Sequence, residues 1–101
     1  MDVFERLRDC TAFEWDDGNS DKNWIKHHVS RVEAEEVFFN QPLVVVDDDL
    51  HSEDEERFYA LGQTDRKRLL FVVFILRARR IRVISVRDMT KREREVYRAH
   101  E

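Results

Sequence analysis

The feature that most constrains the fold of this chain is an unbroken apolar run of eight residues, Leu69 to Leu76. The run is far shorter than the about 20 residues that a membrane-spanning helix needs, and its β-branched and aromatic side chains favour a strand. A strand can lack polar alternation only when both of its faces are covered. We therefore predict that this segment is an interior strand of a sheet.

Three other segments have strand patterns and would be its neighbours. Leu43 to Val46 is β-branched, Arg57 to Gly62 alternates, and Ile81 to Val86 closes the series. Because the connections between the segments are short, the simplest arrangement is an antiparallel meander of four strands. Phe13 to Trp15 also alternates before the turn-forming residues Asp16 to Asn19, so we expect one further short strand there.

Two helices are expected between the short N-terminal strand and the meander. The first begins at Asp21 and places Trp24, Ile25 and His28 on one side. The second runs from about Arg31 to Phe39, after the capping box formed by residues 30–33, and Pro42 prevents its continuation because proline lacks the required N–H.

A third helix is expected at the C-terminus. Thr90 and Glu93 repeat the capping-box spacing, and the helical pattern continues to about His100. Residues 1–12 have no clear period, and 101 residues leave room for one core. We therefore predict an N-terminal extension, residues 1–12, and a single α+β domain, residues 13–101, in which the helices pack on one sheet.

Charge is divided sharply along the chain, which the formal net charge of −4 conceals. Residues 1–65 carry six basic and 18 acidic side chains, whereas residues 66–98 carry 12 basic and three acidic ones. Such asymmetry is typical of a protein with one face for nucleic acid or for an acidic partner. The segment Asp47 to Glu56 has seven acidic residues in ten and is predicted to be an exposed loop.

Several classes of protein are excluded by composition. A single cysteine, Cys10, cannot form an internal disulfide, and no Cys/His spacing resembles a zinc site. Two glycines leave no Gly-rich phosphate loop. We expect no metal, no cofactor, no membrane segment and a cytoplasmic location.

The first candidate for chemistry is the pair Lys26 and His27. An imidazole exchanges protons near neutral pH and an ammonium neutralises phosphate, so together they suit the chemistry of a ribose hydroxyl. The alternative is that both side chains are merely solvated at the end of a helix.

Arg57 and Tyr59 are a second candidate, because the period of two places them on one face of a strand, where they would hold a phosphate and stack on a base. An arginine stem that covers an aromatic ring is the alternative there.

The basic half of the chain is the third candidate. Its arginines offer paired donors that match phosphate oxygens, and several such contacts would give salt-dependent affinity. Simple alternation puts Arg82 and Arg87 on opposite faces of their strand, so both can serve one cleft only if the strand bulges between them. The basic residues are Arg77, Arg79, Arg80, Arg82, Arg87, Lys91, Arg92, Arg94 and Arg98.

The order of these features resembles the BrnT family of bacterial toxins. The matching pieces are FEWD at 13–16, N-x-x-KH at 23–27, EEVF at 35–38, Pro42, the acidic loop with His51-Ser52, ERFYALG at 56–62, LLFVVF at 69–74, RIRVISVR at 80–87 and KRERE at 91–95. The resemblance covers roughly residues 13–97.

The resemblance implies a RelE-like fold, an RNA-cleaving activity that inhibits translation, and neutralisation by a BrnA-type antitoxin. The expected complex is a heterotetramer that binds operator DNA through the antitoxin. The matched motifs, together with the chemistry of their side chains, indicate a set of site residues. The catalytic candidates are Lys26, His27, Arg57, Arg82 and Arg87, and the substrate-binding candidates are Tyr59, Ser85 and Lys91.

The expected mechanism is metal-independent attack of a ribose 2′-OH on the adjacent phosphorus, with cationic side chains stabilising the charge that develops. Two alternatives stay open at this point. A RelE- or ParE-fold toxin would act on a target other than RNA, and a binding module would use its basic face for an acidic partner without nuclease activity.

Overall fold

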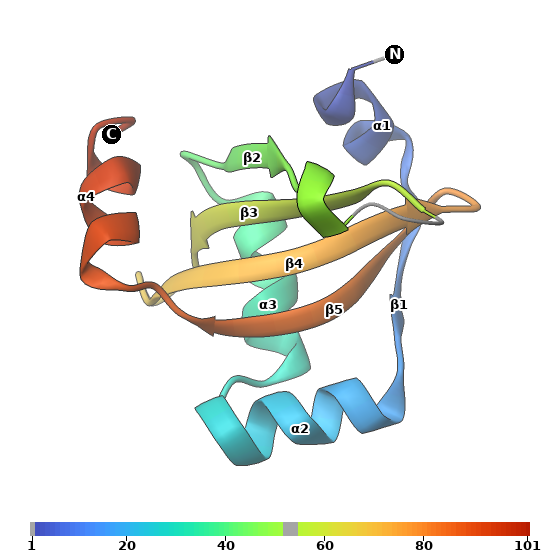
Figure 1. Cartoon of the computed structure of the whole chain (residues 1–101), viewed down its shortest axis with the longest axis horizontal. Coiled ribbons are helices and arrows are strands. Elements are labelled where there is room, and N and C mark those ends of the chain that lie inside the picture. The colour runs from blue at the N-terminus through green and yellow to red at the C-terminus, as the bar shows by residue number, and fades with distance from the viewer. Residues whose placement is uncertain (1, 52–54) are drawn as a thin grey trace.

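A computed structural model describes residues 2–51 and 55–101 and contains one five-stranded mixed sheet (Figure 1). The strands lie in the order β1-β5-β4-β3-β2, and the pairs from β2 to β5 are antiparallel, whereas β1 runs parallel to β5. Residues 52–54 of the predicted acidic loop lie outside the described residues. The strands are β1 (Ala12–Trp15), β2 (Val44–Asp47), β3 (Arg57–Gln63), β4 (Leu69–Arg77) and β5 (Arg80–Asp88).

The described residues also form four α-helices and two short 3-10 helices. The helices are α1 (Val3–Asp9), α2 (Asp17–His27), α3 (Arg31–Glu36) and α4 (Lys91–Arg98), with the 3-10 turns η1 (Val37–Phe39) and η2 (Asp49–His51). Both predicted capping boxes are confirmed, with reciprocal bonds between Ser30 and Glu33 and between Thr90 and Glu93. These bonds satisfy backbone N–H groups that the first helical turn leaves free.

The main core lies between α3 and one face of the sheet, which we call the α3 face. Its buried side chains include Ala34 and Val37 from the helical side and Phe58, Leu70 and Phe74 from the strands. Gly62 permits the close approach, because a Cβ there would lie 2.5 Å from a methyl group of Val37. The N-terminal helix α1 adds Val3 and Leu7 to the edge of this core.

The opposite face, which we call the α4 face, is covered at one end only. Tyr97 of α4 packs with Leu61 and Met89, and its hydroxyl donates a 2.7 Å hydrogen bond to the carbonyl of Pro42. In Figure 1, α4 stands beside the ends of β3 and β4 while α3 crosses behind the sheet. Helix α4 does not cover the remainder of this face.

The four-stranded meander and the interior place of β4 are confirmed. The expectation that both faces of β4 are covered is wrong in part: Leu70, Val72 and Phe74 are buried, but Phe71 and Val73 on the other face are only half-buried. Apolar residues therefore remain within reach of solvent on the α4 face.

The expected start of α2 is wrong. The helix begins at Asp17 and not Asp21, because the Asp16 carboxylate accepts the Asn19 N–H and caps a first turn that the sequence pattern assigned to a loop. The large apolar side chains of this helix lie mostly outside the core: Trp24 and Ile25 are 54% and 75% exposed, whereas Asn23 is buried. In the described part of the chain, no helix is long and apolar enough to cross a membrane.

Candidate functional site

A bulge in β5 brings the predicted strand residues onto one face. Val73 pairs with Ser85 and Phe74 with Val83, so Ile84 is an extra residue that shifts the alternation. Arg82, Ser85 and Arg87 therefore all lie on the α4 face, opposite Ile75, Val73 and Phe71 in the register of β4. The conflict between Arg82 and Arg87 that simple alternation predicts is removed by this single residue.

Three planar side chains form a row across the α4 face. The rings of Tyr59 and Phe71 are stacked with centroids 5.1 Å apart, and the Arg87 guanidinium carbon lies 4.0 Å from the centroid of Phe71. Since β4 lies between β3 and β5, Tyr59 and Arg87 approach Phe71 from opposite sides. Glu93 fixes the end of the row by accepting bonds of 2.8 and 3.0 Å from Arg87.

Arg57 and Arg82 flank the same half of this face, because both are opposite Ile75 in the register. Arg82 is tied to the neighbouring parallel strand by a 2.8 Å ion pair with Glu14 and lies 3.7 Å from Asp16. Two carboxylates therefore balance its charge. Arg57 begins β3 and is half-buried.

Lys26 and His27 lie beside the second half of β5. A groove runs between α2 and this strand and is lined by Lys26, His27, Ser85 and Arg87 among others. We call it the α2–β5 groove. Because Ser85 and Arg87 belong both to the groove and to the α4 face, the two surfaces are continuous. The structure thus brings six of the eight candidates along one path: Lys26, His27, Arg57, Tyr59, Ser85 and Arg87.

The other two candidates lie differently. Arg82 is on the same face but is engaged by carboxylates. Lys91 is the exposed first residue of α4, at the end of the sheet that this helix covers. Among the described residues, no group of three or more His, Cys, Asp or Glu side chains is placed to hold a metal ion.

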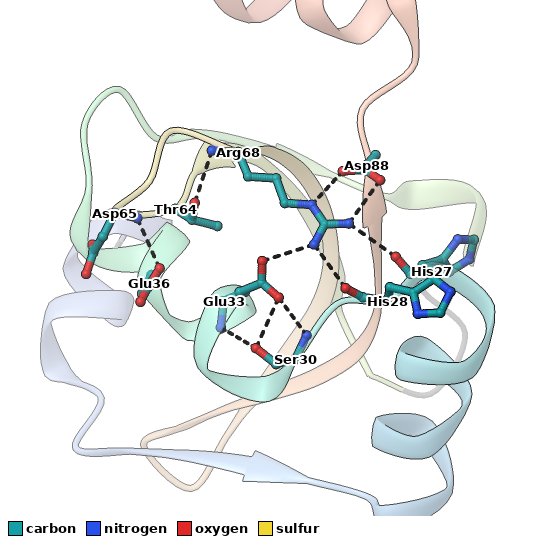
Figure 2. Close-up of polar contacts among 9 residues, drawn as sticks. All are labelled: His27, His28, Ser30, Glu33, Glu36, Thr64, Asp65, Arg68 and Asp88. Atoms are coloured by element: carbon teal, nitrogen blue, oxygen red, sulfur yellow. Dashed lines mark hydrogen bonds and ion pairs between the residues drawn. The ribbon is translucent and has the colours of Figure 1, made fainter.

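The end of α2 is fixed by Arg68, a residue that the sequence analysis did not single out (Figure 2). Its guanidinium donates to both oxygens of Asp88 at 2.8 and 3.0 Å and to Glu33 at 3.0 Å. It also donates to the backbone carbonyls of His27 and His28 at 3.2 and 3.0 Å. Arg68 therefore holds the catalytic candidate His27 against the end of β5.

These contacts shift the pKa values of several side chains. The hydrogen bonds from Arg68 hold the pKa of Asp88 below its ordinary value, and bonds to Asp88 raise the pKa of Arg68. Partial burial acts to raise the pKa of Glu33. The hydrogen bonds from the Ser30 N–H and from Arg68 outweigh this effect, so the pKa of Glu33 is lowered. The hydrogen bond from Arg87 likewise lowers the pKa of Glu93. All three carboxylates are therefore ionised at neutral pH and hold their arginines in place.

The sequence analysis did not single out Phe71 either, because a phenylalanine within an apolar run does not reveal which side chains it contacts. Since the resemblance to the BrnT family implies an RNA substrate, we predict that Phe71→Leu weakens binding of single-stranded RNA about 5- to 10-fold, because the planar support for Tyr59 and Arg87 is lost. The swap is apolar and close in size, so we expect it to cost less than about 1.5 kcal/mol of stability. Fluorescence anisotropy with a labelled RNA measures the first effect and thermal unfolding the second. Unchanged affinity in the folded variant would contradict a role for the row in binding.

Comparisons with known proteins agree with this fold. One protein family matches residues 15–93, and it is described as the ribonuclease toxin, BrnT, of type II toxin–antitoxin systems. A similar solved structure is the crystal structure of the Brucella abortus ribonuclease toxin, BrnT, with a TM-score of 0.61 and 19% sequence identity over 80% of this chain and 99% of that one. No curated protein matches the sequence. The family match spans most of the chain and includes strands β2 to β5, so the chain belongs to the BrnT family of ribonuclease toxins.

Proposed function

We propose that this protein is a metal-independent endoribonuclease and that its active site is the α4 face together with the α2–β5 groove. The observation that carries the proposal is the bulge at Ile84. It aligns Ser85 and Arg87 with Tyr59 on one face and makes that face continuous with the groove that holds Lys26 and His27. A base, cationic phosphate ligands and a stacking ring are the groups that this reaction needs.

In the proposed reaction, the imidazole of His27 takes the proton of a ribose 2′-OH. The freed oxygen forms a bond to the adjacent phosphorus, and the bond from phosphorus to the 5′-oxygen of the next nucleotide breaks. That oxygen takes a proton from water and leaves as a 5′-OH, and His27 returns its own proton to the solvent, so the other product ends in a 2′,3′-cyclic phosphate. An imidazole is suited to the first step, since an ordinary ammonium keeps its proton at neutral pH.

The cationic side chains stabilise the charge that builds on the phosphoryl oxygens. We assign this role to Lys26, Arg57 and Arg87, and we assign contact with a base to Tyr59, whose ring is stacked on Phe71. Ser85 offers a hydroxyl beside Arg87, and Lys91 would contact the RNA further along the strand. Arg82 is joined to Glu14 of the neighbouring strand β1, so we propose that this residue secures β1 against β5 more than it binds phosphate.

Membership of a type II toxin–antitoxin family implies a cognate protein partner. We propose that a BrnA-type antitoxin neutralises this chain in the cytoplasm. We further propose that the complex is a heterotetramer that binds operator DNA through the antitoxin, and that the free toxin inhibits translation by cutting RNA.

Expression in bacteria tests this function. We predict that the chain alone arrests growth, that cellular RNA is fragmented, and that co-expression of the antitoxin encoded beside it restores growth. Sequencing of RNA ends and incorporation of labelled amino acids measure the two cellular effects. Growth arrest with intact RNA would indicate a target other than RNA, and normal growth with a folded protein would indicate a binding module.

A further inference from the structure

The side of α2 that faces the sheet edge is polar, which reverses the usual arrangement of a surface helix. The residues of α2 that line the α2–β5 groove include Lys22, Asn23, Lys26 and His27, spaced by three and four residues. Such spacing places them in one stripe along the helix. Trp24 and Ile25, the large apolar residues of the helix, are exposed instead. Departures from the hydrophobic pattern of this kind concentrate at functional sites.

The groove is rich in hydrogen-bond donors and in positive charge. Lys22 and Lys26 supply its positive charge, and His27 and Arg87, which is paired with Glu93, also line it. No Asp or Glu is among its lining residues in the described part of the chain. Two acidic residues are adjacent in sequence to lining residues: Asp21 precedes Lys22, and Asp88, which follows Arg87, is bonded to Arg68. A surface with these groups favours an anion that carries several acceptor oxygens, as a phosphate does.

One donor in the groove is already buried without an acceptor. The side chain of Asn23 is 4% exposed, and its Oδ1 accepts the backbone N–H of Val86 at 3.3 Å. Its Nδ2 has no hydrogen-bond partner among the described residues. A buried donor without an acceptor is costly, so a phosphate oxygen that reaches Nδ2 after the side chains over it move aside would bind with a gain.

We propose that Lys22 and Asn23 form a subsite for a backbone phosphate of the RNA, next to the phosphate that is cleaved. The subsite rests on the proposed function, since RNA is its ligand. Asn23 lies one helical turn from Lys26 and His27, a rise of about 5 Å along the helix axis, so adjacent phosphates of one strand lie against successive turns of α2. The RNA then crosses the row of Tyr59, Phe71 and Arg87 and leaves the sheet along the groove.

The test uses Lys22→Gln, which removes one charge from an exposed position and leaves the core intact. The probe is a labelled single-stranded RNA with 2′-O-methyl groups throughout, so that binding is measured without cleavage. We expect Lys22→Gln to weaken binding several-fold and to reduce the slope of log affinity against log salt by about 0.7, the value for one lost phosphate contact. The matched control is Arg8→Gln on α1, which removes one charge from an exposed position outside the groove.

Asn23→Asp tests the amide separately. It keeps an oxygen for the Val86 N–H and replaces the free donor with an acceptor, so we expect about 10- to 100-fold weaker binding of the same RNA. If this variant does not fold, Lys22→Gln still decides the question. Equal affinity and equal salt slope for Lys22→Gln and Arg8→Gln would overturn the subsite.

The binding assay also keeps the subsite separate from the nuclease proposal. A loss of binding in Lys22→Gln, with no cleavage of ordinary RNA by the unmodified protein, would support the subsite and contradict the nuclease. Cleavage by the unmodified protein, with Lys22→Gln binding as well as the control, would support the nuclease and overturn the subsite.

Discussion

Replacing His27 with asparagine is expected to lower the rate of RNA cleavage about 10²- to 10⁴-fold, the range for loss of a positioned general base. His27 lines the groove that contains Ser85 and Arg87. The fold should survive the change, because the contact that fixes this residue is between its backbone carbonyl and Arg68 and does not involve the imidazole. Single-turnover cleavage of a labelled RNA, at enzyme concentrations above saturation, measures the chemical step directly.

The chain provides a matched control in the next residue. His28 ends the same helix in a left-handed conformation, with φ of 53°, and its ring packs against Trp24 with centroids 5.6 Å apart. Asparagine tolerates this backbone conformation, so His28→Asn should fold and cleave RNA at a rate close to that of the unmodified protein. Equal rates for the two variants would contradict the assignment of His27 as the base.

The largest effect on stability is expected from Arg68→Met. This change removes the hydrogen bonds that join Asp88, Glu33 and the end of α2, and it leaves the half-buried Glu33 and the more exposed Asp88 without their cation. Hydrogen bonds to charged groups contribute about 1.5–3 kcal/mol each before coupling is considered, and Arg68 remains partly exposed, so we expect a total loss of about 2–4 kcal/mol. In a domain of this size each kcal/mol corresponds to about 4–8 °C in Tm.

The same variant should change how stability depends on pH. Asp88 and Glu33 have pKa values in the folded protein below their ordinary values, so the stability they contribute is present above about pH 4 and is lost as the pH falls through their folded values. Without Arg68 this acid dependence should become shallower. Urea unfolding between neutral and acidic pH measures it, and Arg66→Met, at an exposed position in the same turn, is the control. Parallel pH profiles for the Arg68 variant and the unmodified protein would contradict the linkage.

The strands of this fold could be predicted from the sequence because each has a local signature. The run from Leu69 to Leu76 has no polar residue, and the segments on either side alternate, so their order and pairing follow from short connections. The capping boxes at Ser30 and Thr90 were predicted for the same reason, since all of their hydrogen bonds lie within four residues.

Features that depend on distant contacts could not be predicted. The parallel pairing of β1 with β5 joins residues 12–15 to residues 80–83, and no local pattern encodes it. The orientation of α2 could not be predicted either, because the helix turns Asn23 toward the Val86 N–H, a partner 63 residues away, and leaves Trp24 and Ile25 exposed.

The candidate site was predicted in its residue types and not in its geometry. Lys26, His27, Arg57, Tyr59 and Arg87 carry suitable chemistry in the sequence alone, but their common path depends on the bulge at Ile84. A bulge changes the alternation by one residue and leaves no mark in a run of β-branched side chains. Arg68 escaped notice because its partners lie 20 to 41 residues away.

The most direct test of the proposed function is analysis of the RNA ends that the purified, antitoxin-free protein produces in excess chelator. We predict fragments that end in 2′,3′-cyclic phosphate and begin with 5′-OH, greatly reduced for His27→Asn and absent when the RNA carries 2′-O-methyl groups. RNA that stays intact with the folded protein, or fragments with 3′-OH and 5′-phosphate ends, would contradict the proposal that a ribose 2′-OH is the nucleophile.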